Sequence, residues 1–354
     1  MQKSPPDPHP RAVGALWYGF DDADFLFNQC EGPAGRHRDL SIVPNDRDAE
    51  RLLVLAPPIG PGSKPKPRNG PKRWIARRRG TWDAVWTDHA WDVLARDPRD
   101  IISLVYEPPE QFTDAWWEVA NRRAALNFGP DPRAHRPVRL PTMWTLDDPL
   151  ALLRSTTPPP PADRPLPLVA ITSGTRHLPG HKQRIAFLER LAAEGLPLSA
   201  FGRRLPATLQ PGGPVRSKGN ILRAARYAVV VENSAEGDLY VSEKLWDAIL
   251  CGCVPLYFGS RAADIMIPSD AFIRLPDLGN AGVQAVRDAV HREPAQRTID
   301  AMNEARAEIL GPLRLVEWLA AVLDDRPIHP ALRPDSETTP AGAPAPAPPG
   351  SVPS

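Results

Sequence analysis

A short polar loop carries the side chains that are best suited to chemistry. It lies within "VENSAEGDLYVSEKLWDAILCGCVPLYFG" (231–259), between a predicted strand over 228–233 and a predicted helix over 243–251. In an open parallel sheet, ligands bind beyond the carboxyl ends of the strands, where loops and helix N-termini converge. We therefore expect Glu232 and Asn233, at the end of the strand, to face such a crevice.

The start of the following helix has the features of an anion site. Ser242 is the expected N-cap, which places Glu243 and Lys244 in the first turn beside free N–H groups. A lysine at a helix N-terminus suits a diphosphate. Glu243 would repel a phosphate, so we expect it to accept hydrogen bonds from neutral hydroxyls such as those of a ribose. The apolar spacing places Lys244 and Asp247 off the core face.

Each of these charges, taken alone, is typical of a solvated helix start. Taken together with the flanking segments, they form a pattern. "ENSAEGDLYVSEKLWDAILCGCVPLYFGS", followed by "IPSDAFIRLPDL", resembles the C-terminal signature of the α-1,3-fucosyltransferase family (glycosyltransferase family 10), most closely over 228–278. The resemblance implies a GT-B fold, in which two Rossmann-like α/β domains face a cleft. It also implies GDP-fucose as donor, a glycan hydroxyl as acceptor and inversion at the sugar.

The resemblance also implies roles for residues that bind the donor. In "AITSGTRHLPGHKQRIAFLERL", Arg184 occupies the place of an arginine that contacts the diphosphate, with Arg176 as a nearby alternative. By the same comparison, Asn233 and Tyr240 contact the guanosine-diphosphate part. Glu243 contacts the ribose or the sugar. Lys244, beside its helix start, neutralises the diphosphate.

An inverting transfer needs a general base, and this base should come from the opposite domain. The predicted strand "IISLVYE" ends with Glu107 before a Pro-Pro pair, which resembles the position of the family's catalytic glutamate. Glu110 is the alternative base. "RLPTMW" (139–144) then resembles the family's R-x-P stretch. An edge-strand carboxylate without a catalytic role is the competing interpretation of Glu107.

Alternation of strands and helices predicts two α/β domains in series. We expect an N-terminal acceptor-side domain over 1–153, a Pro-rich linker over 154–167, a nucleotide-sugar-binding domain over 168–325 and a disordered tail over 326–354. The predicted strands cover 15–20, 51–57, 83–88, 101–107, 124–129, 168–173, 198–202, 228–233 and 254–259. The predicted helices cover 21–30, 111–123, 181–195, 218–227, 243–251, 281–292, 295–310 and 313–324.

Composition narrows the remaining classes of function. A net charge of +1 gives no general attraction to nucleic acid, and the chain has no run of about 20 apolar residues, so a cytoplasmic protein is expected. Three cysteines cannot form a disulfide framework, which favours a reducing compartment. The basic run over 63–80 is a solvated face or a contact for an anionic membrane or an acidic acceptor.

No metal is expected, because cationic side chains already balance the diphosphate and acidic pairs such as Asp147–Asp148 are common. His177 and His181 do not share a helical face, since Pro179 and Gly180 intervene. Two alternative functions remain at this point. One is a GT-B enzyme that uses another nucleotide sugar, and the other is a non-catalytic protein that binds a sugar nucleotide or a glycan.

Overall fold

The protein is described by a computed structural model over residues 11–17, 24–31, 35–44, 46–55, 91–92, 94, 96–176 and 178–335. The strand predicted over 83–88, the basic run over 63–80 and His177 lie outside the described residues. Within these ranges, no helix has both the length and the hydropathy that a membrane span requires.

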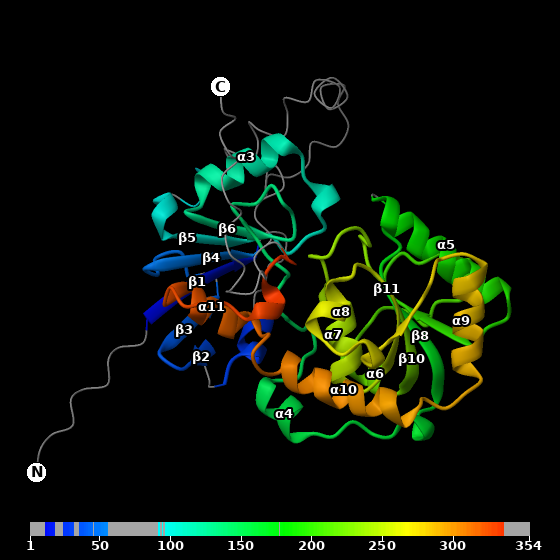
Figure 1. Ribbon diagram of the computed structural model, residues 1–354. Coiled ribbons are helices and arrows are strands. Elements are labelled where there is room, and N and C mark those ends of the chain that lie inside the picture. The colour runs from blue at the N-terminus through cyan, green and yellow to red at the C-terminus, as the bar shows by residue number, and fades with distance from the viewer. Residues whose placement is uncertain are drawn as a thin grey trace, which may run out of the picture.

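The first sheet has seven strands in the order β2-β3-β1-β4-β5-β6-β7 (Figure 1). Neighbouring strands are parallel except for the short antiparallel pair β2–β3, which the sequence did not indicate. The strand predicted over 101–107 is shorter in the structure, so Glu107 lies in the bend that follows it. The strands are β1 (Arg11–Trp17), β2 (Arg36–His37), β3 (Leu40–Pro44), β4 (Arg51–Leu55), β5 (Ile101–Leu104), β6 (Leu126–Gly129) and β7 (Arg136–Pro137).

The second sheet has five parallel strands in the order β12-β11-β10-β8-β9. The chain runs outward in one direction from β8 to β9 and in the other from β10 to β12, so the strand order reverses between β8 and β10. Such a switch point opens a crevice at the carboxyl ends of the two strands. The strands are β8 (Leu166–Ile171), β9 (Leu198–Phe201), β10 (Ala225–Val231), β11 (Val254–Phe258) and β12 (Ile273–Arg274).

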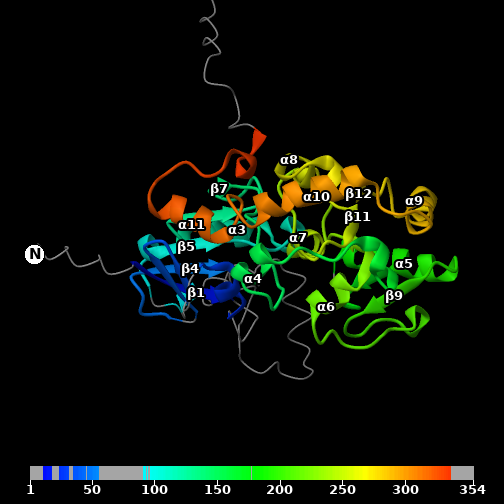
Figure 2. The same cartoon turned by 90° about the horizontal axis from the view of Figure 1, so that it is seen from below.

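Helices cover both faces of each sheet, as a parallel sheet requires. Beside the second sheet, α5 and α9 lie on the outer side, and α6, α7 and α10 lie nearer the first sheet (Figures 1 and 2). The helix predicted over 21–30 is a 3-10 helix, η1 (Asp24–Gln29). The α-helices of the described residues are α3 (Asp114–Arg123), α4 (Leu150–Ser155), α5 (Pro179–Ala193), α6 (Lys218–Arg223), α7 (Glu243–Leu250), α8 (Ala262–Met266), α9 (Asn280–Val290), α10 (Gln296–Ile309) and α11 (Leu315–Leu323).

The last long helix returns to the first sheet. Alternate residues of β4 separate the two faces of that sheet, with Leu52 packing in the cluster of α3 and Leu53 in the cluster that contains α11. Trp318 of α11 meets Phe128 of β6 edge to face, with 4.9 Å between the ring centroids. The spatial unit that contains the first sheet therefore includes α11, although 168–325 was expected to form one domain.

Residues 326–335, the first part of the tail that was predicted to be disordered over 326–354, are ordered in the structure. Residues 326–335 contain a 3-10 helix, η8 (Pro330–Leu332), and Leu332 is 0% exposed. The buried guanidinium of Arg139 bonds the carbonyl of Arg333 and the carboxylate of Asp335. The proline-rich composition indicated disorder. The burial of Leu332 and the hydrogen bonds from Arg139 nevertheless hold this segment against the protein. Residues 336–354 lie outside the described ranges.

Leu332→Ala is expected to lower the free energy of unfolding by about 2–5 kcal/mol, because it leaves a cavity at a fully buried position. Leu152→Ala is the matched control, since Leu152 is 47% exposed, and should cost less than about 1 kcal/mol. Thermal and urea unfolding of both variants measure the difference. Equal, small effects would show that residues 326–335 do not pack against the protein.

Candidate donor site at the switch point of the second sheet

The loop that follows β10 is closed at its base by a buried carboxylate. Glu232, which is 2% exposed, accepts hydrogen bonds from the Ser242 backbone N–H at 2.9 Å and the Ser242 Oγ at 2.6 Å. These bonds tie the end of β10 to the residue that begins α7. Sequence reasoning placed Glu232 toward the crevice but gave it no function, because its partner stands ten residues away along the chain.

The predicted cap of α7 is confirmed, and it holds the site lysine. The Ser242 Oγ accepts the backbone N–H of Lys244 at 3.4 Å, and the Lys244 Nζ lies 2.8 Å from the same oxygen. The ammonium also lies 3.6 Å from Glu232 and 3.7 Å from Glu243. With a side chain that is 19% exposed, Lys244 is held in one place at the mouth of the loop while its charge remains accessible.

Glu243 lies in the first turn of α7, as predicted, in a strongly positive field. Burial acts to raise the pKa of this carboxyl, but the ammonium groups of Lys244 and Lys218 and bonds to the helix start outweigh it, so that its pKa falls to about 2. Glu243 is therefore an ionised acceptor at neutral pH. That state suits hydrogen bonds from the hydroxyl groups of a ligand.

Arg184 and Asn233, predicted from separate segments, meet across the switch point. The Arg184 Nη1 donates to Asn233 Oδ1, and Arg184 is 5% exposed. Gly180 permits this approach, because a Cβ on it would lie 2.0 Å from the Asn233 carbonyl oxygen. Burial lowers the pKa of the Arg184 guanidinium, and Glu232 opposes that shift. The Arg184 Nε has no hydrogen-bond partner among the residues that the structure describes, which leaves one buried donor for a ligand.

The two other residues predicted to bind the donor have different positions. Tyr240 is buried inside the loop, where desolvation and then the carboxylates of Glu232, Glu243 and Glu107 raise the pKa of its phenol well above 10. It is a neutral hydroxyl at all ordinary pH values. Arg176, the alternative to Arg184, is exposed and points to Glu189 of α5, 3.5 Å away. The structure thus groups Arg184, rather than Arg176, with the site loop.

Asp247 was expected to lie away from the core, but it is fully buried. Residues from two other segments, Thr145 and Lys218, cover that side of α7. Thr145, from the segment that leaves the first sheet, donates its N–H to Asp247 at 3.0 Å and its hydroxyl at 2.8 Å. The ammonium of Lys218 pairs with the same carboxylate and lies 3.1 Å from the Thr145 hydroxyl. Burial raises the pKa of Asp247. The helix period alone could not reveal this partner, since it comes from another part of the chain.

Glu107, the predicted base, lies beyond β5 of the first sheet and near the donor loop. Burial raises the pKa of its carboxyl to about 7, with Lys244 acting to lower it and Glu243 to raise it. Both of these charges belong to the start of α7, and the hydrogen bond from Ser234 to Glu110 brings the segment after β5 to the loop that leads into this helix. A half-buried carboxyl with a pKa near neutrality is suited to accept a proton at physiological pH.

Glu110, the alternative base, also approaches the donor loop but is already engaged. It belongs to the 3-10 helix η4 (Pro109–Gln111) and accepts a hydrogen bond from the Ser234 Oγ at 2.5 Å. Ser234 is 6% exposed and follows Asn233 directly. The two predicted carboxylates therefore have different surroundings. Glu107 is half-buried near the start of α7, and Glu110 is hydrogen-bonded to Ser234 in the unit of the second sheet.

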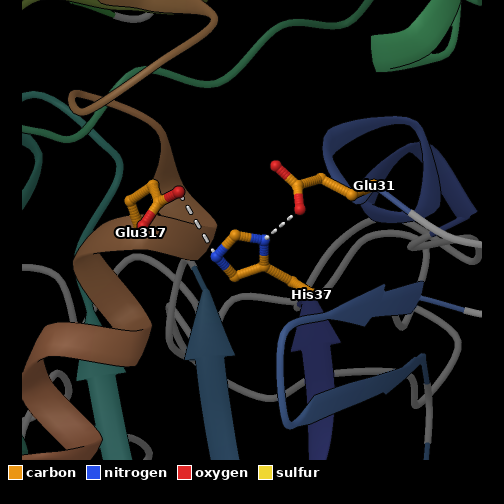
Figure 3. A group of neighbouring side chains, drawn as sticks. All are labelled: Glu31, His37 and Glu317. Atoms are coloured by element: carbon orange, nitrogen blue, oxygen red, sulfur yellow. Dashed lines mark ion pairs between the residues drawn. The ribbon is translucent and has the colours of Figure 1, made fainter.

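One group of candidate metal ligands occurs among the described residues, formed by Glu31, His37 and Glu317. Figure 3 shows the imidazole between the two carboxylates, with Nδ1 3.7 Å from Glu31 and Nε2 3.4 Å from Glu317. The Arg314 guanidinium contacts both carboxylates, at 3.3 and 3.0 Å. Arg154 also pairs with Glu31 and Arg38 with Glu317, so the arginines of the protein balance the charge of both carboxylates. The group joins β2 to α11 and has no member in the donor loop.

Comparisons with known proteins cover both the sequence and the fold. Residues 170–286 match the model of the family described as glycosyltransferase family 10 (fucosyltransferase) C-term. No curated protein sequence matches the chain. An alpha-glucosyltransferase solved in complex with UDP and a 13-mer DNA is similar in structure, with a TM-score of 0.54 and 11% identity over 89% of this chain and 99% of that one.

Two solved alpha1,3-fucosyltransferase structures are also similar. One has a TM-score of 0.37 and 13% identity over 83% of this chain and 84% of that chain. The other, with GDP-fucose, has a TM-score of 0.38 and 13% identity over 88% and 94% of the two chains.

The predicted fold class is confirmed, since the two α/β units with their parallel-rich sheets share the GT-B architecture of the alpha-glucosyltransferase. The matched segment contains β10, the loop with Asn233 and the capped start of α7 with Lys244, which are the elements that carried the resemblance in the sequence. Over residues 170–286, the chain is thus similar to glycosyltransferase family 10, the fucosyltransferase family.

Proposed function

We propose that the protein transfers fucose from GDP-fucose to a hydroxyl group of a glycan, with inversion at the anomeric carbon. The observation that carries this proposal is the convergence of two cations on one crevice, with a carboxyl group of raised pKa facing it. Arg184 and Lys244 border the switch point of the second sheet, and Glu107 faces the same helix start from the first sheet. The family match over 170–286 supports the choice of donor.

In the proposed reaction, the acceptor oxygen attacks the anomeric carbon from the face opposite the diphosphate. Its proton passes to the carboxylate of Glu107, and the bond between the anomeric carbon and the phosphate oxygen breaks. The negative charge that grows on the leaving GDP is stabilised by Arg184 and Lys244. Because both cations are held in place by the protein, little reorganisation is needed as that charge develops.

The other predicted donor residues have complementary parts in this proposal. Asn233 is fixed by Arg184 and presents its remaining polar atoms at the carboxyl end of β10. Glu243 is ionised and accepts hydrogen bonds from ribose or sugar hydroxyls. Tyr240 is buried beneath the loop, so we propose that it shapes the nucleotide pocket through its ring.

Lys244→Met tests the donor site. It is expected to weaken the binding of GDP and GDP-fucose by about 10–100-fold, because it removes a charge-assisted contact to the diphosphate. Arg287→Met, which removes a partly exposed positive charge on α9 that pairs with Glu194, is the control and should leave the affinity unchanged. Isothermal calorimetry with GDP and UDP measures both effects. Tighter binding of UDP than of GDP in the wild type would contradict GDP-fucose as the donor.

Glu107→Gln tests the base. It is expected to lower kcat by about 10²–10⁴-fold while GDP affinity stays within about twofold, because the amide keeps the shape but cannot take the proton. In the wild type, kcat/KM should fall as the pH drops below about 7, since protonation removes the base. Lys244→Met should shift this fall to higher pH, because Lys244 lowers the pKa of Glu107. A flat profile between pH 5 and 9 would exclude Glu107 from this role.

We also propose that transfer proceeds without a divalent metal, since Arg184 and Lys244 supply the positive charge beside the diphosphate. Treatment with EDTA is then expected to leave the rate of fucose transfer within about twofold. The measurement is made before and after adding excess Mg²⁺ or Mn²⁺. Loss of transfer with EDTA that either ion restores would contradict the proposal.

A further inference from the structure

The segment that follows β5 is held rigidly against its own domain. It contains Glu107, two consecutive prolines and the 3-10 helix with Glu110. The Arg133 guanidinium donates to the carbonyl oxygens of Pro109 at 3.3 Å and Phe112 at 3.4 Å. The same guanidinium is paired with Asp131 at 2.6 Å. Because proline fixes φ at positions 108 and 109, the chain between Glu107 and Glu110 has few free torsions, which favours the transmission of a displacement from Glu110 to Glu107.

The opposite end of this segment is bonded to the donor loop of the other unit. Ser234 Oγ donates to Glu110 Oε1 at 2.5 Å and accepts the backbone N–H of Glu236 at 3.4 Å. Ser234 follows Asn233, which is itself bonded to Arg184. A continuous series of contacts therefore runs from the arginine of the donor site to the segment that carries the proposed base.

We propose that Glu110 is a positioning residue, which acts through Ser234 to hold Glu107 opposite the donor. This inference rests on the proposed role of Glu107 and assigns Glu110 a different part from that of a base. The carboxylate of Glu110 accepts a hydrogen bond from the Ser234 hydroxyl. Glu107 is instead influenced by the charges at the start of α7. A shift of about 1 Å in the position of a base can change a rate by about 100-fold, so one contact of this kind can govern the rate.

Substitutions at both partners separate this role from that of a base. Glu110→Ala and Ser234→Ala should each lower kcat/KM for fucose transfer by about 10-fold, and the double variant should lose no more than either single variant. Glu110→Gln should retain activity within about threefold, because its amide oxygen can still accept the Ser234 hydroxyl. The fall in activity below pH about 7 should keep its midpoint in all of them. Glu118→Ala, on the exposed face of α3, is the matched control.

Two outcomes of the activity measurements overturn the proposal. If Glu110→Gln is as inactive as Glu110→Ala while Ser234→Ala is fully active, Glu110 is the base. If the losses from Glu110→Ala and Ser234→Ala multiply in the double variant, the two residues act independently and no positioning contact joins them.

Amide hydrogen exchange provides a readout that does not depend on transfer. The N–H groups of Gln111 and Phe112 are bonded to the carbonyls of Pro108 and Pro109 at 3.0 and 3.2 Å. Their exchange, and that of Glu236, should speed up in Glu110→Ala and Ser234→Ala but not in Glu110→Gln or Glu118→Ala. Unchanged exchange in Glu110→Ala would overturn the contact itself. Faster exchange in a protein that transfers no fucose would instead contradict the proposed function and leave the positioning contact standing.

Discussion

The structure of the donor site depends on one buried negative charge, the carboxylate of Glu232. A buried carboxylate is costly unless hydrogen bonds and opposite charges surround it. Here the backbone and hydroxyl of Ser242 and the ammonium of Lys244 meet that need. The consequence is geometric, because the charge can be satisfied only if the loop closes and Ser242 begins α7. The position of Lys244 therefore follows from the folding of the loop.

The topology of the second sheet explains why these groups face a ligand. The strand order reverses between the neighbouring strands β8 and β10, so the loops that follow them lead away in opposite directions. A crevice is left between these two loops at the carboxyl ends of the strands. Gly180 brings the start of α5 within contact of Asn233, which a larger residue would prevent. Arg184 thereby reaches the loop after β10 although it stands 49 residues away from Asn233 in the chain.

Features confined to one segment could be predicted from the sequence. The cap at Ser242, the first turn with Glu243 and Lys244, and the strand before them are confirmed, because local propensity and hydrophobic period determine each of them. The partner of Asp247 was missed, since Thr145 and Lys218 come from distant segments. The ordered segment over 326–335 was missed for the same reason. Its proline-rich composition indicated disorder, whereas the burial of Leu332 and the bond from Arg139 depend on distant parts of the chain. The bond between Ser234 and Glu110 joins two sheets, and no local pattern reports it.

The return of α11 to the first sheet has a mechanical consequence. The chain crosses between the two units once on the way out, after Thr142, and once on the way back, before Leu315, and these crossings are joined by backbone hydrogen bonds of 2.7 and 2.9 Å. Two connections bonded side by side fix one edge of the contact between the units. The position of the segment after β5 relative to the donor loop is therefore set at two separate places, this crossing and the Ser234–Glu110 hydrogen bond.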